Sequence, residues 1–126
     1  QAAVALGQTL RFSEIISKRK QIEEWYSEGL SDIKEIRKMP KRDVLWMYDI
    51  MAFKRYELMK YLEEKGIETR TFFRPMTSQP MYYDIDYPVT NAWRMFLDGM
   101  YLPTFTDITK DEVDMVCKTI KSFYNG

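Results

Sequence analysis

Two arginines four residues apart are the side chains of this sequence that most directly suggest a binding chemistry. Arg70 and Arg74 lie in the stretch GIETRTFFRPM, which alternates like a strand until it meets Pro75. In a strand, residues i and i+4 point to the same face, roughly 13 Å apart. Guanidinium groups so placed can hold two anionic groups of one extended ligand, such as phosphates or carboxylates. The alternative is two surface arginines paired with Glu68 or another acid, and the spacing alone leaves it open.

The segment after this strand, MTSQPMYYDIDY, is rich in hydrogen-bonding side chains, and binding residues often collect on loops held by a scaffold. The loop offers five adaptable hydrogen-bonding side chains, Thr77, Ser78, Gln79, Tyr82 and Tyr83. The candidate substrate-binding residues are therefore Arg70, Arg74, Thr77, Gln79 and Tyr82. A plain connector with packed tyrosines is the other interpretation.

Composition excludes several classes of site. The chain has 126 residues, 45% of them apolar, no histidine and a net charge of zero. Without histidine, Ser-His-Asp and Cys-His catalysis by this chain are excluded, and with the single Cys117 a zinc site is not expected. Cys117 lies on an apolar stripe, and this position predicts a buried core side chain. We therefore expect no catalytic residue, no metal ligand and no nucleic-acid partner, since nucleic-acid binders usually carry a basic excess.

The chain length corresponds to about one domain. No apolar run approaches the roughly 20 residues of a membrane-spanning helix, and no signal peptide is visible, so we expect a cytoplasmic protein without a membrane partner. The basic clusters 18–20 and 38–42 have acidic residues nearby and should be solvated. Because the chain starts at Gln1 within an apparent helix, we expect it to be a piece of a longer protein.

The hydrophobic periodicity predicts a first half made of helix, strand and helix. Residues 1–30 predict one long helix, or two in line, ending near Gly29. Residues 34–43 form a charged connector broken by Pro40. Residues 43–53 predict a central strand covered on both faces. Residues 54–65 predict a helix that ends at Gly66, with Ile67 packing back on Leu62.

The second half predicts two more strands and two more helices. A strand over 67–73 is followed by a short helix over 90–98, with Trp93 and Phe96 or Leu97 inward, and by a strand over 100–103. Thr109 and Glu112 form a capping box that starts the last helix. The fold class is α+β: a two-layer small domain with a short, mostly antiparallel sheet of about three strands packed by helices, preceded by the long N-terminal helix.

Four segments in order resemble one known family. They are QAAVALGQ, KRKQIEEWYSEGL, EKGIETRTFFRPM with its QPMY, and YLPTFTDITKDEVDMVCKTI. Together they resemble the C-terminal part of the sugar-nucleotide aminotransferases, the DegT/DnrJ/StrS group of fold-type-I enzymes, over essentially the whole chain.

The resemblance implies a homodimeric enzyme that uses pyridoxal phosphate (PLP) to move an amino group, usually from glutamate, onto a nucleotide-linked keto sugar. The Schiff-base lysine and most of the cofactor site would lie in a large domain preceding Gln1, so no cofactor-binding residue is expected here. Residues 1–30 would be the linking helix and 31–126 the small domain, which closes over the cleft. Arg70 and the loop from Arg74 to Tyr82 would face the substrate.

The chain departs from the family pattern at three positions. Thr71 stands where many relatives have proline, Thr77 where many have histidine, and Ala5 where glycine is usual. The missing loop histidine points to a different sugar or an altered function, while the fold expectation is little affected.

Two other functions stay open at the level of sequence. One is a freestanding module that binds an anion or nucleotide through Arg70, Arg74 and the tyrosine loop. The other is an oligomerisation domain that uses the apolar N-terminal helix, since exposed apolar surface favours association.

Overall fold

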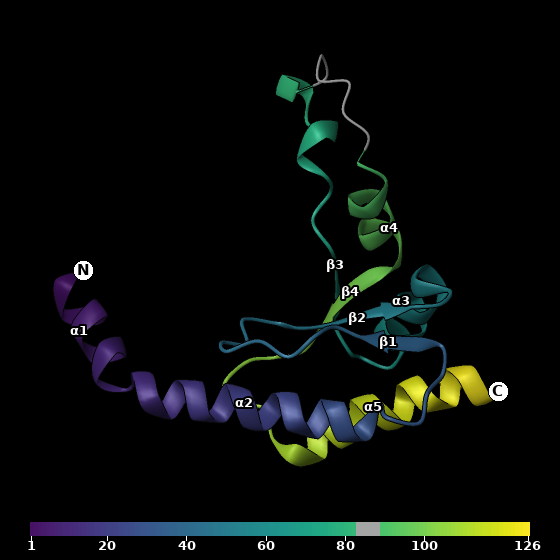
Figure 1. Ribbon diagram of the computed structural model, residues 1–126. Helices are drawn as coiled ribbons and strands as arrows, with labels where there is room; N and C mark the ends of the chain where they lie inside the picture. The colour runs from purple at the N-terminus through teal and green to yellow at the C-terminus, as the bar shows by residue number, and fades with distance from the viewer. Residues whose placement is uncertain (83–88) are drawn as a thin grey trace.

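The computed structural model describes residues 1–82 and 89–126. Its N-terminal quarter consists of two consecutive helices, α1 (Ala2–Leu10) and α2 (Phe12–Gly29), separated at Arg11. Every residue of α1 is exposed, whereas α2 buries Ile22 and Tyr26 against the rest of the chain. Figure 1 shows α1 turning away from the line of α2, beyond the body of the domain.

The sheet has four strands where the sequence predicts about three. The strands are β1 (Ile36–Lys38), β2 (Tyr48–Ala52), β3 (Arg70–Thr71) and β4 (Gly99–Leu102), in the order β1-β2-β4-β3 with every pair antiparallel. The additional strand, β1, lies in the predicted charged connector. Three residues are too few to show an alternating pattern, and only Ile36, which pairs with Ala52, is buried.

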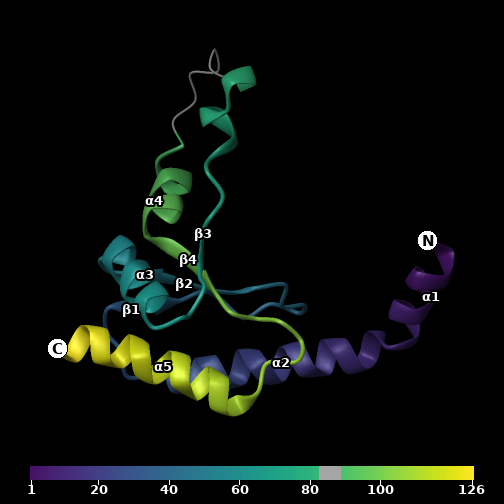
Figure 2. The ribbon, with the colours of Figure 1, turned by 180° about the vertical axis from the view of Figure 1, so that it is seen from behind.

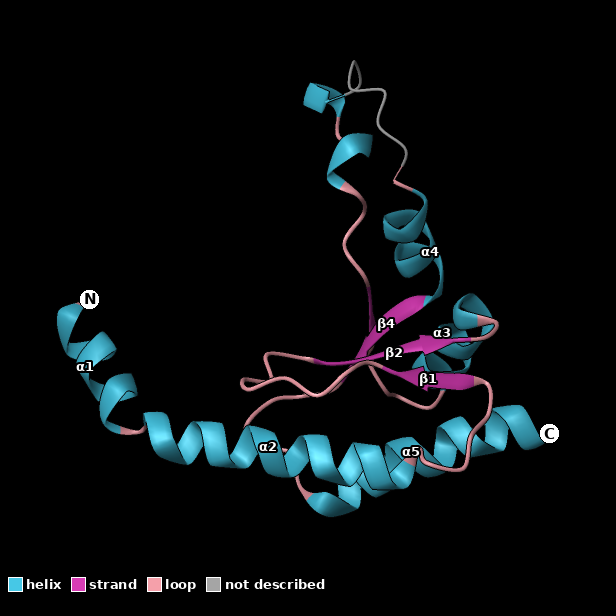
Figure 3. Ribbon diagram, in the orientation of Figure 1, coloured by secondary structure: helices cyan, strands magenta, loops and turns pink. Residues whose placement is uncertain are grey.

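Three helices cover one face of this sheet and form a two-layer α+β domain. They are α2, α3 (Arg55–Glu64) and α5 (Lys110–Asn125), and α5 packs against both of the others. Figures 2 and 3 show α2 and α5 side by side beneath the strands. Buried side chains from the helices and from Tyr48, Ile50, Ala52, Met100 and Leu102 form one core. The alternating residues Asp49 and Met51 face the opposite side of the sheet.

The helix ends are formed as the sequence predicts. Gly66 has φ +77°, and the Ile67 N–H donates to the Leu62 carbonyl at 2.9 Å, which closes α3 in a Schellman motif. At the start of α5, Thr109 and Glu112 form the capping box. The tie between Ile67 and Leu62 also explains why β3 is shorter than the predicted strand 67–73. The first residues of that segment belong to the helix exit.

The described residues between β3 and β4, 72–82 and 89–98, project from the sheet as an arm. It comprises the 3-10 turns η1 (Met76–Ser78) and η2 (Pro80–Tyr82) and the helix α4 (Thr90–Asp98), and Figure 1 shows it standing away from the helix layer. The predicted inward packing of α4 is wrong for Trp93, 38% exposed, and for Leu97, 57% exposed, whereas Phe96 is half-buried. The helix lies beside the strand ends rather than over the core.

Candidate functional site

One row of side chains crosses the sheet face that the helices leave free. In register, Asp49 of β2 lies opposite Tyr101 of β4, and Tyr101 lies opposite Arg70 of β3. Directly opposed residues in antiparallel strands point to the same face. The row therefore presents a carboxylate, a phenol and a guanidinium side by side, and Arg70 stands at its edge.

Within the described residues, Asp49 is the buried charged side chain, and it is paired. The Arg42 guanidinium donates a hydrogen bond to the Asp49 carboxylate, which ties the connection before β2 to the sheet. Burial raises the pKa of Tyr101, with the negative charge of Asp49 adding to the rise and Arg42 opposing it. The pairing satisfies a carboxylate that would otherwise be expensive to bury.

Aromatic rings gather beside this row. Phe72 stacks on Tyr101 with ring centroids 4.7 Å apart. The ring centroid of Phe73 lies 6.2 Å from that of Tyr101 and 6.4 Å from that of Trp46. A Cβ on Gly99 would lie 2.4 Å from the Phe72 ring, so a glycine at the start of β4 lets this ring lie on the strand. The exposed members of the patch are Trp46 at 64% and Phe73 at 71%.

A groove of about 550 Å³ opens next to Arg70 and Trp46. Its walls are built from the segment before β2, the exit of α3, the end of β4 and the first turns of α5. The charged and aromatic side chains among the lining residues include Arg19, Trp46, Glu68, Arg70, Tyr101 and Glu112. Arg19 of α2 reaches across and donates to the backbone carbonyls of Leu45, at 3.3 Å, and Trp46. These bonds hold the segment outside the strand ladder, so β2 begins at Tyr48 and not at residue 43 as predicted.

The five residues nominated from the sequence are divided between the sheet edge and the arm in this structure. Arg70 lines the groove and has a long contact, 3.5 Å, with Glu68, whereas the guanidinium carbon of Arg74 lies 5.7 Å from the centroid of the Phe96 ring in the arm. Thr77 and Tyr82 are half-buried in the two 3-10 turns of the arm, and Gln79 is half-buried between them. Tyr83 lies outside the described residues.

Sequence reasoning missed Trp46, Asp49 and Tyr101 as members of this surface. The first two lie inside the apolar run 43–53, which predicts a strand covered on both faces and so treats every side chain as core. A charged residue within an apolar run was the available signal for Asp49.

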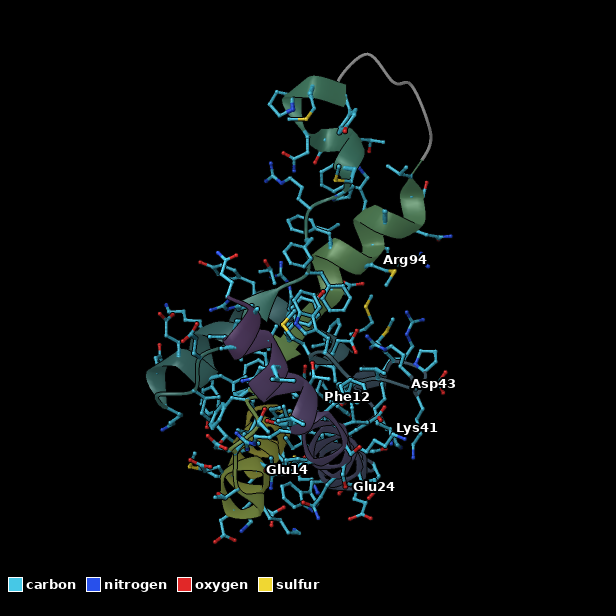
Figure 4. All side chains as sticks on the ribbon, turned by 90° about the vertical axis from the view of Figure 1, so that its left-hand side faces the viewer. Phe12, Glu14, Glu24, Lys41, Asp43 and Arg94 are labelled. Carbon is cyan, nitrogen blue, oxygen red and sulfur yellow. The ribbon has the colours of Figure 1, made fainter. Side chains whose placement is uncertain are left out.

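Other charges lie at the surface. Lys41 and Asp43 are both exposed on the β1–β2 connection, and Arg94 lies apart from them on α4 (Figure 4). Lys110 pairs with Asp114 at 2.7 Å, both at the surface. In the basic segment 38–42, Lys41 is solvated, whereas Lys38 donates to the Ser27 backbone carbonyl at 3.0 Å and Arg42 is held by Asp49.

Residues 1–82 and 89–126 offer no buried lysine that could hold pyridoxal phosphate. Every lysine of the chain is at least partly exposed, and a Schiff-base lysine is usually activated by desolvation. The buried carboxylate of Asp49 already holds Arg42. Burial raises the pKa of the Cys117 thiol to about 12, so this group is a core side chain and not a nucleophile.

Residues 1–82 and 89–126 contain no group of three or more side chains that could hold a metal ion. None of the helices in those ranges has the length and apolar character needed to cross a bilayer.

Comparisons with known proteins agree on one family. The model of the DegT/DnrJ/EryC1/StrS aminotransferase family matches residues 1–121. The chain is 31% identical to the GDP-perosamine synthase of Escherichia coli O157:H7, over 98% of this chain and 35% of that protein. It is 30% identical to the GDP-perosamine synthase of Caulobacter vibrioides, over 92% of this chain and 34% of that protein. The chain thus spans about a third of the length of these relatives.

Solved structures share the fold at lower identity. DesV of S. venezuelae, solved in complex with a ketimine intermediate, superposes with a TM-score of 0.91 at 20% identity, over 100% of this chain and 36% of that one. Helicobacter pylori PseC, an aminotransferase involved in the biosynthesis of pseudoaminic acid, superposes with a TM-score of 0.86 at 15% identity, over 98% of this chain and 36% of that one.

Proposed function

The chain belongs to the DegT/DnrJ/EryC1/StrS aminotransferase family, and from this membership we propose that it is the C-terminal portion of a PLP-dependent enzyme. The enzyme transfers an amino group, with glutamate as the donor, to a nucleotide-linked keto sugar. The observation that carries the proposal is the family match over residues 1–121 of 126. The named relatives at about 30% identity, both GDP-perosamine synthases, support a nucleotide sugar as substrate.

In this proposal PLP belongs to the part of the enzyme outside residues 1–126, because the exposed lysines here offer no place for it. The cofactor supplies the bond chemistry, and this portion orients the substrate and closes over it. Residues 31–126 are the small domain and α1 with α2 form the link to the large domain. The enzyme is a cytoplasmic homodimer, in keeping with a lone, buried thiol at Cys117.

The substrate contacts proposed for this portion are in two places. Arg70 presents its guanidinium at the sheet edge, and Arg74, Thr77, Gln79 and Tyr82 lie along the arm. In this proposal the arm, which stands away from the helix layer, reaches a ligand held on its own side of the sheet. That arrangement favours a domain that completes a cleft together with another body.

The test is amino transfer by the full-length protein that carries this sequence. With PLP and nitrogen-labelled glutamate, label should appear in a nucleotide-linked keto sugar, while purified residues 1–126 should neither transfer nor take up PLP stoichiometrically. Transfer by the isolated portion would overturn the proposal. Tight nucleotide binding by a protein that never transfers would favour the freestanding module instead.

A variant in the arm tests the contacts separately from the family. Gln79→Ala should raise KM for the sugar nucleotide by about tenfold, the value of one lost hydrogen bond to a charged group. Met81→Ala, in the neighbouring 3-10 turn and 75% exposed, serves as the matched control and should leave KM unchanged. If Gln79→Ala had the same KM and kcat as Met81→Ala, Gln79 would not be a substrate contact. The proposed amino transfer would not be affected by that result.

A further inference from the structure

We propose that Arg55, the first residue of α3, is a positioning residue of the enzyme. Its guanidinium holds the C-terminus of α4 and so fixes the direction in which the arm leaves the sheet. Four of the five proposed substrate contacts lie on that arm, so the inference deepens the proposed function and rests on it. Arg55 itself lies outside the arm, at the start of a helix of the layer that covers the sheet.

The arm has little packing of its own to keep it in one orientation. No residue of α4 is buried, and the main contacts of this helix with the domain are with β4 and β2. Among residues 73–82 only Pro75 is buried. Helices in proteins gain most of their stability by packing an apolar face against other elements. The orientation of the arm therefore depends on a few contacts at its base.

The two limbs of the arm are joined to each other. The Phe72 N–H donates to the Gly99 carbonyl at 3.2 Å, where the chain leaves β3 and returns to β4. Farther out, the guanidinium carbon of Arg74 lies 5.7 Å from the centroid of the Phe96 ring, within the range of a cation–π contact. The described parts of the two limbs should therefore move together.

Arg55 connects the arm to the helix layer. Its Nε donates to the Leu97 carbonyl at 2.6 Å, and Figures 2 and 3 show the end of α4 beside α3. This carbonyl lies in the last turn of α4, where a helix leaves carbonyl groups without a partner of its own. Because α4 has no basic residue in its last turn, Arg55 supplies the positive charge that a helix C-terminus favours.

The guanidinium is itself held from the side of the core. Its Nη1 donates to the Met59 sulfur, one turn along α3, at 3.3 Å. The residue two positions before Arg55 is fixed as well, since the Phe53 N–H donates to the Glu35 carbonyl at 3.0 Å and the Tyr124 hydroxyl donates to the Phe53 carbonyl at 2.6 Å. A series of contacts thus runs from α5 through the start of α3 to the arm. The hydrogen bond from the charged Arg55 is of the strong kind, and its loss should release the arm.

Hydrogen exchange in the ligand-free, full-length protein tests this anchor. Arg55→Met removes the charge and the donor but keeps an apolar stem beside Met59. The amides of residues 90–98 should then exchange about tenfold faster, while those of α3 and α5 keep the parent rate. Arg55→Lys keeps a charge and a donor and should restore most of the protection. Lys60→Ala removes an exposed cation from the same helix and is the matched control, with no change expected.

Kinetics with PLP test whether the anchor positions the substrate contacts. Arg55→Met should raise KM for the sugar nucleotide by about tenfold, whereas KM for glutamate should stay the same because the proposed contacts of the arm are with the sugar nucleotide. The effect of Gln79→Ala on KM should shrink in the Arg55→Met background, since both changes act through the position of the arm. Arg55→Lys should return KM most of the way to the parent value.

Three outcomes would overturn Arg55 as a positioning residue. They are unchanged exchange of residues 90–98 in Arg55→Met, faster exchange there with an unchanged KM for the sugar nucleotide, and an equal loss of protection in α3 and α5, which would indicate general destabilisation. Amino transfer by the parent protein separates the two proposals. If the parent transfers and Arg55→Met behaves as the parent does, the positioning role alone is wrong. If the parent does not transfer, the proposed function is wrong, and the positioning role with it.

Discussion

At the scale of single residues, the contact between Gly29 and Cys117 sets how closely the two long helices approach. Gly29 ends α2, and a Cβ built there would lie 2.6 Å from the Cys117 sulfur and 3.1 Å from its Cβ. Cys117 is buried on the inner face of α5. The glycine is therefore required by packing, although an alanine would be the better helix former.

A double-mutant cycle tests this contact. Gly29→Ala should lower the free energy of unfolding by about 1–3 kcal/mol through overpacking. In a Cys117→Ala background the same change should be neutral or stabilising, since the clashing sulfur is gone and the helix gains propensity. Urea denaturation of the four proteins gives the coupling energy. Additive effects would show that Gly29 is kept for another reason.

The same cysteine predicts how stability depends on pH. Burial raises the pKa of its thiol from an ordinary value near 9 to about 12, so the folded state binds the proton more tightly than the unfolded state. The stabilisation is complete below pH 9 and is lost as the pH rises from 9 to 12, by at most about 1.4 kcal/mol per pH unit. The buried hydroxyls of Tyr26 and Tyr48, whose pKa values burial also raises, act in the same direction.

Unfolding free energies at pH 7, 9, 10 and 11 in the presence of a reductant check this dependence. The parent should lose stability above pH 9, and Cys117→Ala, although less stable at pH 7, should decline less steeply. If the free energy of unfolding fell equally steeply with pH in the two proteins, the loss of stability at alkaline pH would be due to the tyrosines.

At the scale of elements, the turn after α3 decides where β3 can start. Gly66 adopts φ +77° with open space around its Cα, so only backbone conformation demands glycine there. The turn brings Ile67 back onto the helix and leaves only Arg70 and Thr71 to pair with β4. The position of Arg70 at the groove thus depends on a helix cap.

Two glycine-to-alanine substitutions should change the free energy of unfolding differently. Gly66→Ala should destabilise by about 1 kcal/mol because an L-residue is strained at positive φ. Gly7→Ala, in the exposed helix α1 with nothing within 4 Å of the added carbon, should not destabilise, since alanine is the better helix former. Thermal or urea unfolding of both variants measures this. A neutral Gly66→Ala would contradict the requirement for the left-handed turn.

At the scale of the whole molecule, apolar surface remains exposed far from the core. Val4, Leu6, Leu10 and Phe12 are each at least 59% exposed, and Figure 2 shows α1 apart from the sheet and its helix layer. Large apolar surface left exposed on a folded protein commonly marks a contact with another protein surface. In the proposed enzyme that surface is the remainder of the protein or the second subunit.

Removing residues 1–10 from the isolated chain tests the independence of α1. The truncated chain should stay more soluble and less self-associated in size-exclusion chromatography, while its unfolding midpoint stays the same, because α1 buries none of its residues. The untruncated chain is the control. A lowered midpoint would show that α1 contributes to the stability of the core.

Local patterns in the sequence were enough for the helices and their ends. The capping box at Thr109, the left-handed Gly66 and the apolar stripe of α5 depend on neighbours within a few residues, so the α+β class could be predicted from them. Strand β1 could not, because a three-residue edge strand has no period of its own and exists only through pairing with β2.

The composition of the candidate site depends on long-range contacts even more strongly than the strands do. The sequence places Arg70 and Arg74 on one strand face, but β3 ends at Thr71 and Arg74 turns into the arm toward Phe96. Tertiary structure alone brings together Arg70, Tyr101 and Trp46, which are far apart in the chain, because sheet order and the reach of Arg19 across to the segment before β2 decide which side chains share a face. Short-range spacing determines elements, whereas pairing between distant strands determines the surface they present.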